Sequence, residues 1–304
     1  MNFKTPILFL TFNRLNTTQA VLDSIRTVQP SRLYLASDGY RSNRKGEDEL
    51  VESVRNYVSN HIDWKCEIKT LFRKKNLGCG VAVRSAIDWF FEHESEGIIL
   101  EDDCVPDKSF FYFCQDLLLH YKNDERVMAI NGMNVGKSDL DSKHSYSFSR
   151  YSLPWGWATW RRAWHYNNDV IKDWPAIKET NFLLNVGHGN RAFQDYWTNR
   201  FDEAYGNGNH TWDHQWILSC WWQNGLCVSP NVNLVQNIGY GEDATHTNRE
   251  GMLHTLEKDT IDFPLQHPDY LHSNFEADKF IDRNLFKING YTFLRSRLKK
   301  IISR

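Results

Sequence analysis

The chain has 304 residues, of which 41% are hydrophobic and 24% are charged, and its net charge is −2. This ordinary globular balance excludes an intrinsically disordered chain. The near-neutral charge gives no overall field that would draw the protein to nucleic acid, so we expect no nucleic-acid partner.

Cysteine usage and hydropathy narrow the class of protein further. The six cysteines form no CxxC pair and no zinc-like spacing, so we expect reduced, buried thiols and a cytoplasmic location. The start of the chain, 1–6, has no signal-peptide pattern. No apolar run approaches the roughly 20 residues that a membrane-spanning helix needs.

Strand-like and helix-like segments alternate over the first 130 residues. Apolar residues at helical spacing predict helices, with Asn16 or Thr17 as the cap of the first one. The predicted strands are 6–12, 32–36, 66–72, 97–100 and 127–130, and the predicted helices are 16–28, 47–58, 79–94 and 110–121. This alternation predicts an α/β fold, a mainly parallel sheet with helices on both faces.

Polar residues follow three of the predicted strands directly. They are Asn13 and Arg14, then Asp38, then the triplet Glu101, Asp102 and Asp103. Ligands of parallel sheets bind at the carboxyl ends of the strands, so the sequence predicts a binding site there. Neither GxGxxG nor GxxxxGK[ST] occurs, which leaves a dinucleotide fingerprint and a P-loop without support.

The acidic triplet is the most informative of these features. Three carboxylates at the end of an apolar strand raise each other's pKa, because like charges disfavour ionisation. A bound cation removes that cost, and Mg²⁺ and Mn²⁺ prefer a few carboxylates together with substrate phosphates. A solvated acidic turn is the alternative interpretation of Glu101, Asp102 and Asp103.

The second half of the chain is rich in tryptophan. Ten of the twelve Trp lie between Trp155 and Trp222, and aromatic rings serve both as stacking faces for sugars and as core residues. We expect most of them in the core and two or three at a sugar site. Further along, 212–222 is helical, 228–236 is β-like and 251–268 is an extended wrap. The basic amphipathic end, 294–304, suits either contact with an anionic membrane surface or a frayed, solvated helix.

From Pro6 to about His246 the chain resembles the GT-A glycosyltransferases, which move a sugar from a nucleotide diphosphate to an acceptor. The pattern is similar to that of N-acetylglucosaminyltransferase I and of bacterial nucleotide-diphospho-sugar transferases. The matching segments are 12–14, Asp38, the triplet 101–103, 106–111, 154–157, 212–213 and His246. The resemblance implies a GT-A, Rossmann-like catalytic domain over 1–250 with a Trp-rich half on the acceptor side. A C-terminal extension over 251–304 carries the basic tail.

The resemblance also implies roles for single residues. Arg14 contacts the nucleotide, Asp38 reads the base, and Asp103 holds Mn²⁺ or Mg²⁺ against the diphosphate. The implied donor-binding residues are Arg14, Asp38, Glu101, Asp102, Trp155 and Gly156, the implied metal ligands are Asp103 and His246, and the implied general base is Asp213. Three of these have plain structural alternatives: a strand-to-turn Asp-Gly at Asp38, a helix N-cap at Asp213 and a structural or exposed imidazole at His246.

One departure from the family concerns the segment that carries the base. The family's Trp-Asp-Asp-Trp becomes 212–216 here, one residue longer, which leaves Asp213 as the better base and the role of His214 open. A single base without a nucleophilic carboxylate implies one displacement with inversion at the anomeric carbon.

The sequence therefore predicts a metal-dependent inverting glycosyltransferase. Its donor would be a nucleotide-diphosphate sugar, a UDP-sugar by the role of Asp38, and its acceptor a hydroxyl of a glycan or lipid-linked molecule. Two alternatives stay open, a sugar nucleotidyltransferase and a non-catalytic carbohydrate-binding protein. We expect a cytoplasmic enzyme, with the 294–304 tail as its contact with the inner face of the membrane.

Overall fold

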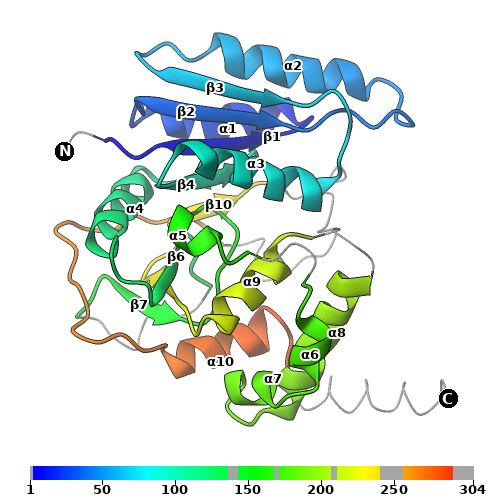
Figure 1. The fold of residues 1–304 in the computed structure, drawn as a ribbon. Coiled ribbons are helices and arrows are strands. Elements are labelled where there is room, and N and C mark those ends of the chain that lie inside the picture. Colours follow the sequence, from blue (N-terminus) through cyan, green and yellow to red (C-terminus); the bar gives the residue numbers. More distant parts are fainter. Residues whose placement is uncertain (1–2, 136–142, 168–170, 207–210, 240–255, 290–304) are drawn as a thin grey trace.

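A computed structural model describes residues 3–135, 143–167, 171–206, 211–239 and 256–289 (Figure 1). Strands and helices alternate through the first half, and helices dominate the second. In chain order the elements are β1 (Ile7–Thr11), α1 (Leu15–Arg26), β2 (Arg32–Ser37), α2 (Glu47–Asn60), β3 (Glu67–Phe72), α3 (Cys79–His93), β4 (Glu96–Glu101), β5 (Cys104–Pro106), α4 (Lys108–His120), β6 (Val127–Asn131), β7 (Tyr146–Ser149), β8 (Trp157–Trp160), α5 (Arg161–Trp164), α6 (Trp174–Lys178), α7 (Phe182–Val186), α8 (Arg191–Gly206), α9 (Asp213–Trp222), β9 (Leu226–Pro230), β10 (Val235–Asn237) and α10 (Phe275–Asn284).

The predicted α/β fold is confirmed, with a correction to the sheet. Eight strands lie in the order β3-β2-β1-β4-β8-β6-β9-β7, and the first four are parallel as predicted. Beyond β4 the sheet is mixed, because β8 enters between β4 and β6 and pairs antiparallel with both. No strand was predicted in this tryptophan-rich segment, and all four residues of β8 are buried.

Element boundaries in the first half follow the predictions closely, with two local errors. Helix α1 begins at Leu15, so Asn16 and Thr17 lie inside its first turn and do not cap it. The N-cap residue is Arg14, whose side chain makes no capping bond. In α2 the apolar spacing predicts that Leu50 shares one face with Val51 and Val54, but Leu50 is exposed at 50%. The buried face runs instead through Val51, Val54 and Val58.

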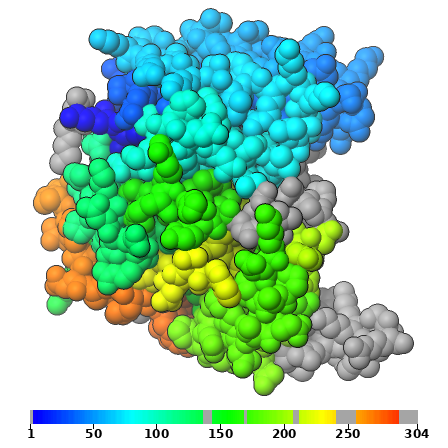
Figure 2. All heavy atoms as spheres, viewed as in Figure 1, coloured from blue at the N-terminus to red at the C-terminus, as the bar shows by residue number. Residues whose placement is uncertain are grey.

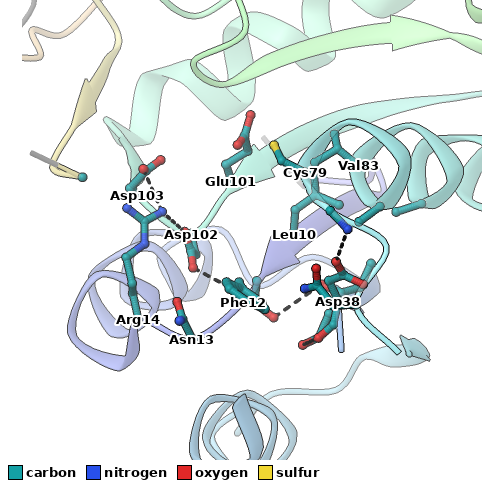
Figure 3. Close-up of a pocket in the computed structure, with 18 of the residues that line it drawn as sticks. Leu10, Phe12, Asn13, Arg14, Asp38, Cys79, Val83, Glu101, Asp102 and Asp103 are labelled. Carbon is teal, nitrogen blue, oxygen red and sulfur yellow. Dashed lines mark hydrogen bonds and ion pairs between the residues drawn. The ribbon is translucent and has the colours of Figure 1, made fainter. Parts of the chain in front are cut away.

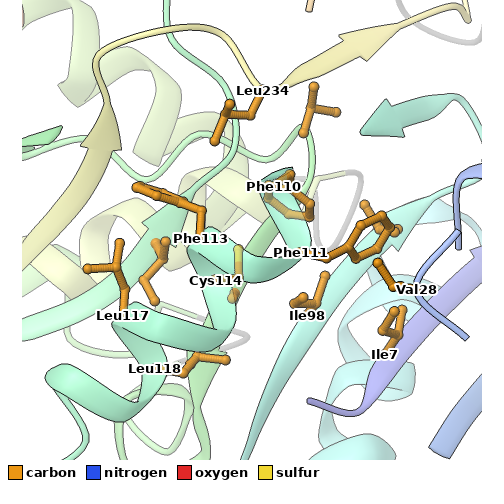
Figure 4. Close-up of a cluster of buried hydrophobic side chains, with 14 of the residues drawn as sticks. Ile7, Val28, Ile98, Phe110, Phe111, Phe113, Cys114, Leu117, Leu118 and Leu234 are labelled. Atoms are coloured by element: carbon orange, nitrogen blue, oxygen red, sulfur yellow. The ribbon is translucent and has the colours of Figure 1, made fainter. Parts of the chain in front are cut away.

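Alternating side chains of the sheet supply two hydrophobic clusters, one on each face. On one face Ile7, Phe9 and Ile98 pack against helices α1 and α4, with Phe110, Phe111 and Leu117 of α4 at the centre (Figure 4). On the other face the next residues along β1, Leu8 and Leu10, pack against α3 and α9. Helices therefore cover both faces, and the strand ends at the edge of the sheet stay open for a site.

A third cluster forms the core of the Trp-rich half. Helices α6, α7 and α8 of this half lie below strands β1–β4 at the lower right of Figure 1, and the same region is green in Figure 2. Its centre is Trp197, which has no exposed surface and packs against Phe201 and Trp221. Eight of the ten Trp in this region are buried, while Trp155 is half-buried and Trp222 is exposed at 49%. The expectation that most of them belong to the core is confirmed.

The C-terminal part of the described chain belongs to this same body. Residues 256–268 run without helix or strand, as the extended wrap predicted, and 251–255 lie outside the described residues. Helix α10, which was not predicted, buries Ile281 in the third cluster. Arg150 is ion-paired to Asp282 of α10 at 2.7 Å. The basic tail 294–304 lies outside the described residues.

In the described ranges, no helix has both the length and the apolar character to cross a membrane. All six cysteines are free thiols, as expected. Four of them are buried, but Cys66 is half-buried and Cys79 is exposed, contrary to the prediction. Cys79 lies at the start of α3 and lines an open pocket.

Candidate active site

The carboxyl ends of β1, β2 and β4 meet at one edge of the sheet. Leu10 of β1 pairs with Glu101 of β4, and Thr11 of β1 pairs with Ser37 of β2. The residues that follow these strands therefore converge, as the sequence predicts. A pocket of about 340 Å³ opens at this edge (Figure 3). Its lining includes six of the predicted site residues, Arg14, Asp38, Glu101, Asp102, Asp103 and Trp155.

Arg14 binds two carboxylates of the acidic triplet. Its Nη2 donates to Oδ1 of Asp102 and, at 2.8 Å, to Oδ2 of Asp103. The other oxygen of Asp102 accepts from the backbone N–H of Phe12 at 3.3 Å. The Asp102 side chain is 5% exposed, against 15% for Asp103 and 25% for Arg14. The triplet is therefore not a solvated acidic turn, because a guanidinium already neutralises part of it.

The pKa values of Glu101, Asp102 and Arg14 are all raised in this pocket. Burial raises the pKa of Glu101 to about 8, and the charges of Asp103, Asp102 and Asp213 add to the rise. Burial also raises the pKa of Asp102 to about 6, although the charge of Arg14 works against it. For Arg14, burial alone would lower the pKa, but its two carboxylate partners outweigh burial and raise it. The pocket therefore stabilises an added positive charge.

Strand β10 and the two residues that follow it also contact Asp103. Nδ2 of Asn237 donates to Oδ1 of Asp103 at 3.3 Å, and the N–H of Ile238 donates to its backbone carbonyl at 2.8 Å. A Cβ at Gly239 would collide with Oδ2 of Asp103 and lie 2.8 Å from Nη1 of Arg14. Asn237 and Gly239 were not predicted as site residues, because the pairing of β10 with β5 that brings this segment to Asp103 is a long-range contact.

Asp38 lies in the pocket and its carboxylate holds the loop before α3. It accepts from the backbone N–H groups of Gly39 at 2.9 Å, Leu77 at 3.0 Å and Gly78 at 3.1 Å. Burial raises the pKa of Asp38, and these three backbone donors oppose the rise. Recognition of the nucleotide base by Asp38 stays a prediction. The hydrogen bonds to Gly39, Leu77 and Gly78 show that this carboxylate also stabilises the loop.

Two further arginines line the pocket and were missed by the sequence analysis. Arg73 directly follows β3, and its guanidinium donates to Oγ of Ser85 at 2.7 Å. The expectation that selected Arg14 and Asp38, that polar residues just after a parallel strand line the site, applies equally to Arg73. Arg41 is ion-paired to Glu47, and its guanidinium lies 5.4 Å from the ring centre of Phe12.

Asp213 approaches the triplet from the Trp-rich half. It is the first residue of α9, whose N-cap is Trp212, so the structure does not support the alternative of an N-cap role for Asp213. The negative charge of Asp213 contributes to the raised pKa of Glu101, so the two carboxylates are close enough to interact electrostatically. Asp213 does not itself line the pocket. His214 lies edge-on to Trp197, with ring centres 5.7 Å apart.

The turn before β8 brings Trp155 to the pocket. Gly156 has φ of +63°, a left-handed conformation that favours glycine, and a Cβ there would lie 2.8 Å from Val235. The turn is fixed by the N–H of Gly132, which donates to the carbonyl of Gly156 at 2.7 Å. Gly156 itself, although a predicted donor-binding residue, is not among the residues that line the pocket. His246, the second predicted metal ligand, lies outside the described residues.

The described residues fit a cation that arrives with a diphosphate better than one bound by protein alone. Among them, no group of three or more His, Cys, Asp or Glu side chains is arranged to hold a metal ion. Asp103 can offer one carboxylate, whose two oxygens now accept from Arg14 and Asn237. One or two carboxylates plus substrate phosphates are the usual ligands of Mg²⁺, so this donor set fits such a complex once Arg14 moves away.

Comparison with known proteins gives structural likenesses only. No protein-family profile matches the sequence, and no curated protein matches it. The structure is similar to mannosyltransferase PcManGT from Pyrobaculum calidifontis in complex with GDP-Man and Mn²⁺, at 13% identity and a TM-score of 0.34. That likeness covers 51% of this chain and 43% of the mannosyltransferase, so the chain spans less than half of that protein.

Two other solved structures resemble the chain to a similar degree. Galactosyltransferase LgtC, in complex with donor and acceptor sugar analogs, is 9% identical, with 71% of this chain and 70% of that chain covered and a TM-score of 0.35. UDP-glucose pyrophosphorylase complexed with UDP-glucose is 12% identical, with 49% and 64% covered and a TM-score of 0.28. Each likeness covers part of the fold, and the function proposed below rests on the pocket.

Proposed function

We propose that this protein is an inverting, metal-dependent glycosyltransferase. It would move a sugar from a nucleotide diphosphate, a UDP-sugar, to a hydroxyl of a glycan or lipid-linked acceptor. The observation that carries the proposal is the pocket at the strand ends, where Arg14 faces Asp102 and Asp103. A guanidinium beside carboxylates at this edge suits a ligand that combines a diphosphate, a divalent cation and sugar hydroxyls.

The donor would lie across the pocket, between the strand ends and the turn at Trp155. Arg14 is a permanent cation whose planar fork of N–H donors matches phosphate oxygens. Trp155 offers an aromatic face for the sugar. We assign donor binding to Arg14, Asp38, Glu101, Asp102, Trp155 and Gly156, with Gly156 acting through the shape of the turn.

Asp103 would hold Mn²⁺ or Mg²⁺, with His246 as the proposed second ligand. When bound, the cation would offset the negative charge that develops on the departing diphosphate. Asn237 keeps the Asp103 carboxylate in place through its 3.3 Å hydrogen bond. The chain's own contribution is to orient that carboxylate and to place Arg14 in the lining of the same pocket, where the diphosphate would bind.

Asp213 is the proposed general base. It would remove the proton from the acceptor hydroxyl as the oxygen attacks the anomeric carbon and the bond to the diphosphate oxygen breaks. Its place at the start of α9, on the Trp-rich side, suits a base that meets the acceptor rather than the nucleotide. One attack with one base and no covalent intermediate inverts the configuration at the anomeric carbon.

A screen of nucleotide sugars with Mn²⁺ and glycan acceptors tests this function. We expect nucleoside diphosphate release from one donor and, by NMR, a product of inverted anomeric configuration. A product of retained configuration would contradict the single displacement. Pyrophosphate release from a nucleoside triphosphate and a sugar phosphate would instead support the nucleotidyltransferase alternative. Glycan binding without any nucleotide affinity would indicate a carbohydrate-binding protein.

We propose that the acceptor is a cell-surface polysaccharide or lipid-linked oligosaccharide and that the enzyme works in the cytoplasm. The basic residues of 294–304 would hold the enzyme at the inner face of the membrane. Deletion of 294–304 tests this, since we expect the truncated protein to leave the membrane fraction. An unchanged distribution would remove the tail from the proposal.

A further inference from the structure

The Arg14 guanidinium occupies the position between Asp102 and Asp103 that a metal ion shared by these two carboxylates would take. Its Nη2 reaches carboxylate oxygens of both Asp102 and Asp103. On the other side of Asp103, Oδ1 accepts from Asn237 at 3.3 Å and from the Cys104 thiol at 3.5 Å. Both oxygens of the proposed metal ligand are therefore engaged by donors from the protein itself.

We propose that Arg14 is an exchangeable cation. In the free protein it offsets part of the negative charge of Asp102 and Asp103, and it transfers to the diphosphate when a nucleotide diphosphate and a divalent cation bind together. This exchange rests on the proposed function. It adds an order of binding, in which the divalent cation binds together with the nucleotide and not before it.

The local structure allows the Arg14 side chain to move while its backbone stays fixed. The carbonyl of Arg14 accepts from the N–H of Thr18 at 3.1 Å and from the Thr18 hydroxyl at 2.7 Å. These bonds hold the start of α1 and do not involve the guanidinium. The side chain keeps 25% of its surface exposed and lines the pocket, so a swing into the pocket leaves the helix intact.

Charge balance favours the exchange only when both ligands are present. If Arg14 left alone, Asp102 would stay 5% exposed without its partner, which is costly for a charged group. A divalent cation that binds alone meets a carboxylate pair whose negative charge Arg14 already partly offsets, and the nearby guanidinium repels it. A diphosphate offers Arg14 a new anionic partner. The Asp103 carboxylate that Arg14 releases can then bind the divalent cation.

Titration calorimetry with Mn²⁺ alone tests the exchange on the full chain. The variant Arg14→Gln removes the charge, and Arg41→Gln is the matched control, because Arg41 lines the same pocket but is paired to Glu47. We expect wild type and Arg41→Gln to bind Mn²⁺ alone only weakly. Arg14→Gln should bind Mn²⁺ alone roughly tenfold to a hundredfold tighter, since a unit charge a few ångströms from the ion has gone. Equal Mn²⁺ affinity in wild type and Arg14→Gln would overturn the exchange.

A measurement on wild-type protein removes any dependence on how Arg14→Gln folds. With ¹⁵N-labelled arginine, the Arg14 side-chain NMR signal, assigned from Arg14→Lys, should shift on adding UDP with Mg²⁺ and stay in place with Mg²⁺ alone. A shift with Mg²⁺ alone would contradict the proposal. Absence of UDP binding under every condition would instead remove the proposed function, while the Mn²⁺ comparison between the two proteins still decides the role of Arg14.

Discussion

Asn237 and Asp103 lie 134 positions apart in the chain, and Nδ2 of Asn237 donates to Oδ1 of Asp103 at 3.3 Å. The contact exists because β10 pairs antiparallel with β5, directly after the triplet. The acidic triplet is thus held from two directions, by Arg14 after β1 and by the segment that follows β9. The site depends on both halves of the chain.

Gly239→Ala should damage the site without unfolding the protein. The new Cβ would collide with Oδ2 of Asp103 and approach Nη1 of Arg14 to 2.8 Å, so the carboxylate and the guanidinium must shift. We expect UDP affinity in the presence of Mn²⁺ to fall by roughly tenfold, since a displaced charged contact costs on the order of 1 to 3 kcal/mol. Calorimetry and thermal unfolding measure the two effects.

Gly206→Ala is the matched control for that variant, because a Cβ at Gly206 meets nothing within 4 Å. It should leave UDP affinity unchanged. If Gly239→Ala also binds UDP like wild type, Asp103 and Arg14 do not form the nucleotide site.

Asp213→Asn should separate catalysis from donor binding. Loss of a general base slows a reaction by roughly a hundredfold to ten-thousandfold. Because Asp213 lies outside the lining of the pocket, UDP affinity should change by less than about threefold. Transfer rates and calorimetry on the same preparation give both numbers.

His214→Gln is the neighbouring control, since the His214 ring packs against Trp197 and has no assigned role in the chemistry. Its transfer rate should stay within a few fold of wild type. An Asp213→Asn protein that transfers sugar at the wild-type rate would exclude Asp213 as the base.

Asp278 of α10 should make stability depend on pH. Burial raises the pKa of Asp278 to about 6 from an ordinary value of 3.8, against the nearby charge of Arg150. A raised folded-state pKa means that folding favours the protonated acid. This contribution to stability is fully present below about pH 4 and is lost as the pH rises through about 6.

Asp278→Asn stays neutral at every pH and isolates this contribution. Between about pH 4 and pH 7 the free energy of unfolding of wild type should fall relative to the variant by up to roughly 3 kcal/mol. Urea unfolding of both proteins at several pH values measures the difference. A difference that does not change with pH would mean that Asp278 keeps its ordinary pKa in the fold.

The sequence predicted the features that depend on local patterns, namely the elements of the first half and the residues that gather at the strand ends. Periodicity located the strands and helices of the first half, and the rule that ligands bind at strand ends brought Arg14, Asp38 and the triplet together correctly. Pairing between distant segments leaves no such local pattern. The insertion of β8 beside β4 and the contact of Asn237 with Asp103 therefore had to come from the structure.

The hydrogen-bond and ion-pair partners of single side chains also could not be predicted from the sequence. The triplet was expected to need a cation, and the structure supplies a first one from within the chain, Arg14. Asp38 was expected to face a base, and its carboxylate also holds the backbone of Leu77 and Gly78. Residue type and spacing indicate that charged groups meet, but not which partner each oxygen has.

Calorimetric titration of UDP, with and without Mn²⁺, tests the central claim most directly. Wild type should bind UDP with an affinity that depends on Mn²⁺. In Asp103→Asn the UDP affinity in the presence of Mn²⁺ should be lower by at least about tenfold, because a charged ligand of the cation has been removed. Asp63→Asn, whose side chain is 69% exposed on the surface, should bind like wild type. UDP binding that is absent, or that is independent of Mn²⁺ and unchanged in Asp103→Asn, would contradict the assignment of this pocket to a nucleotide-sugar donor and its cation.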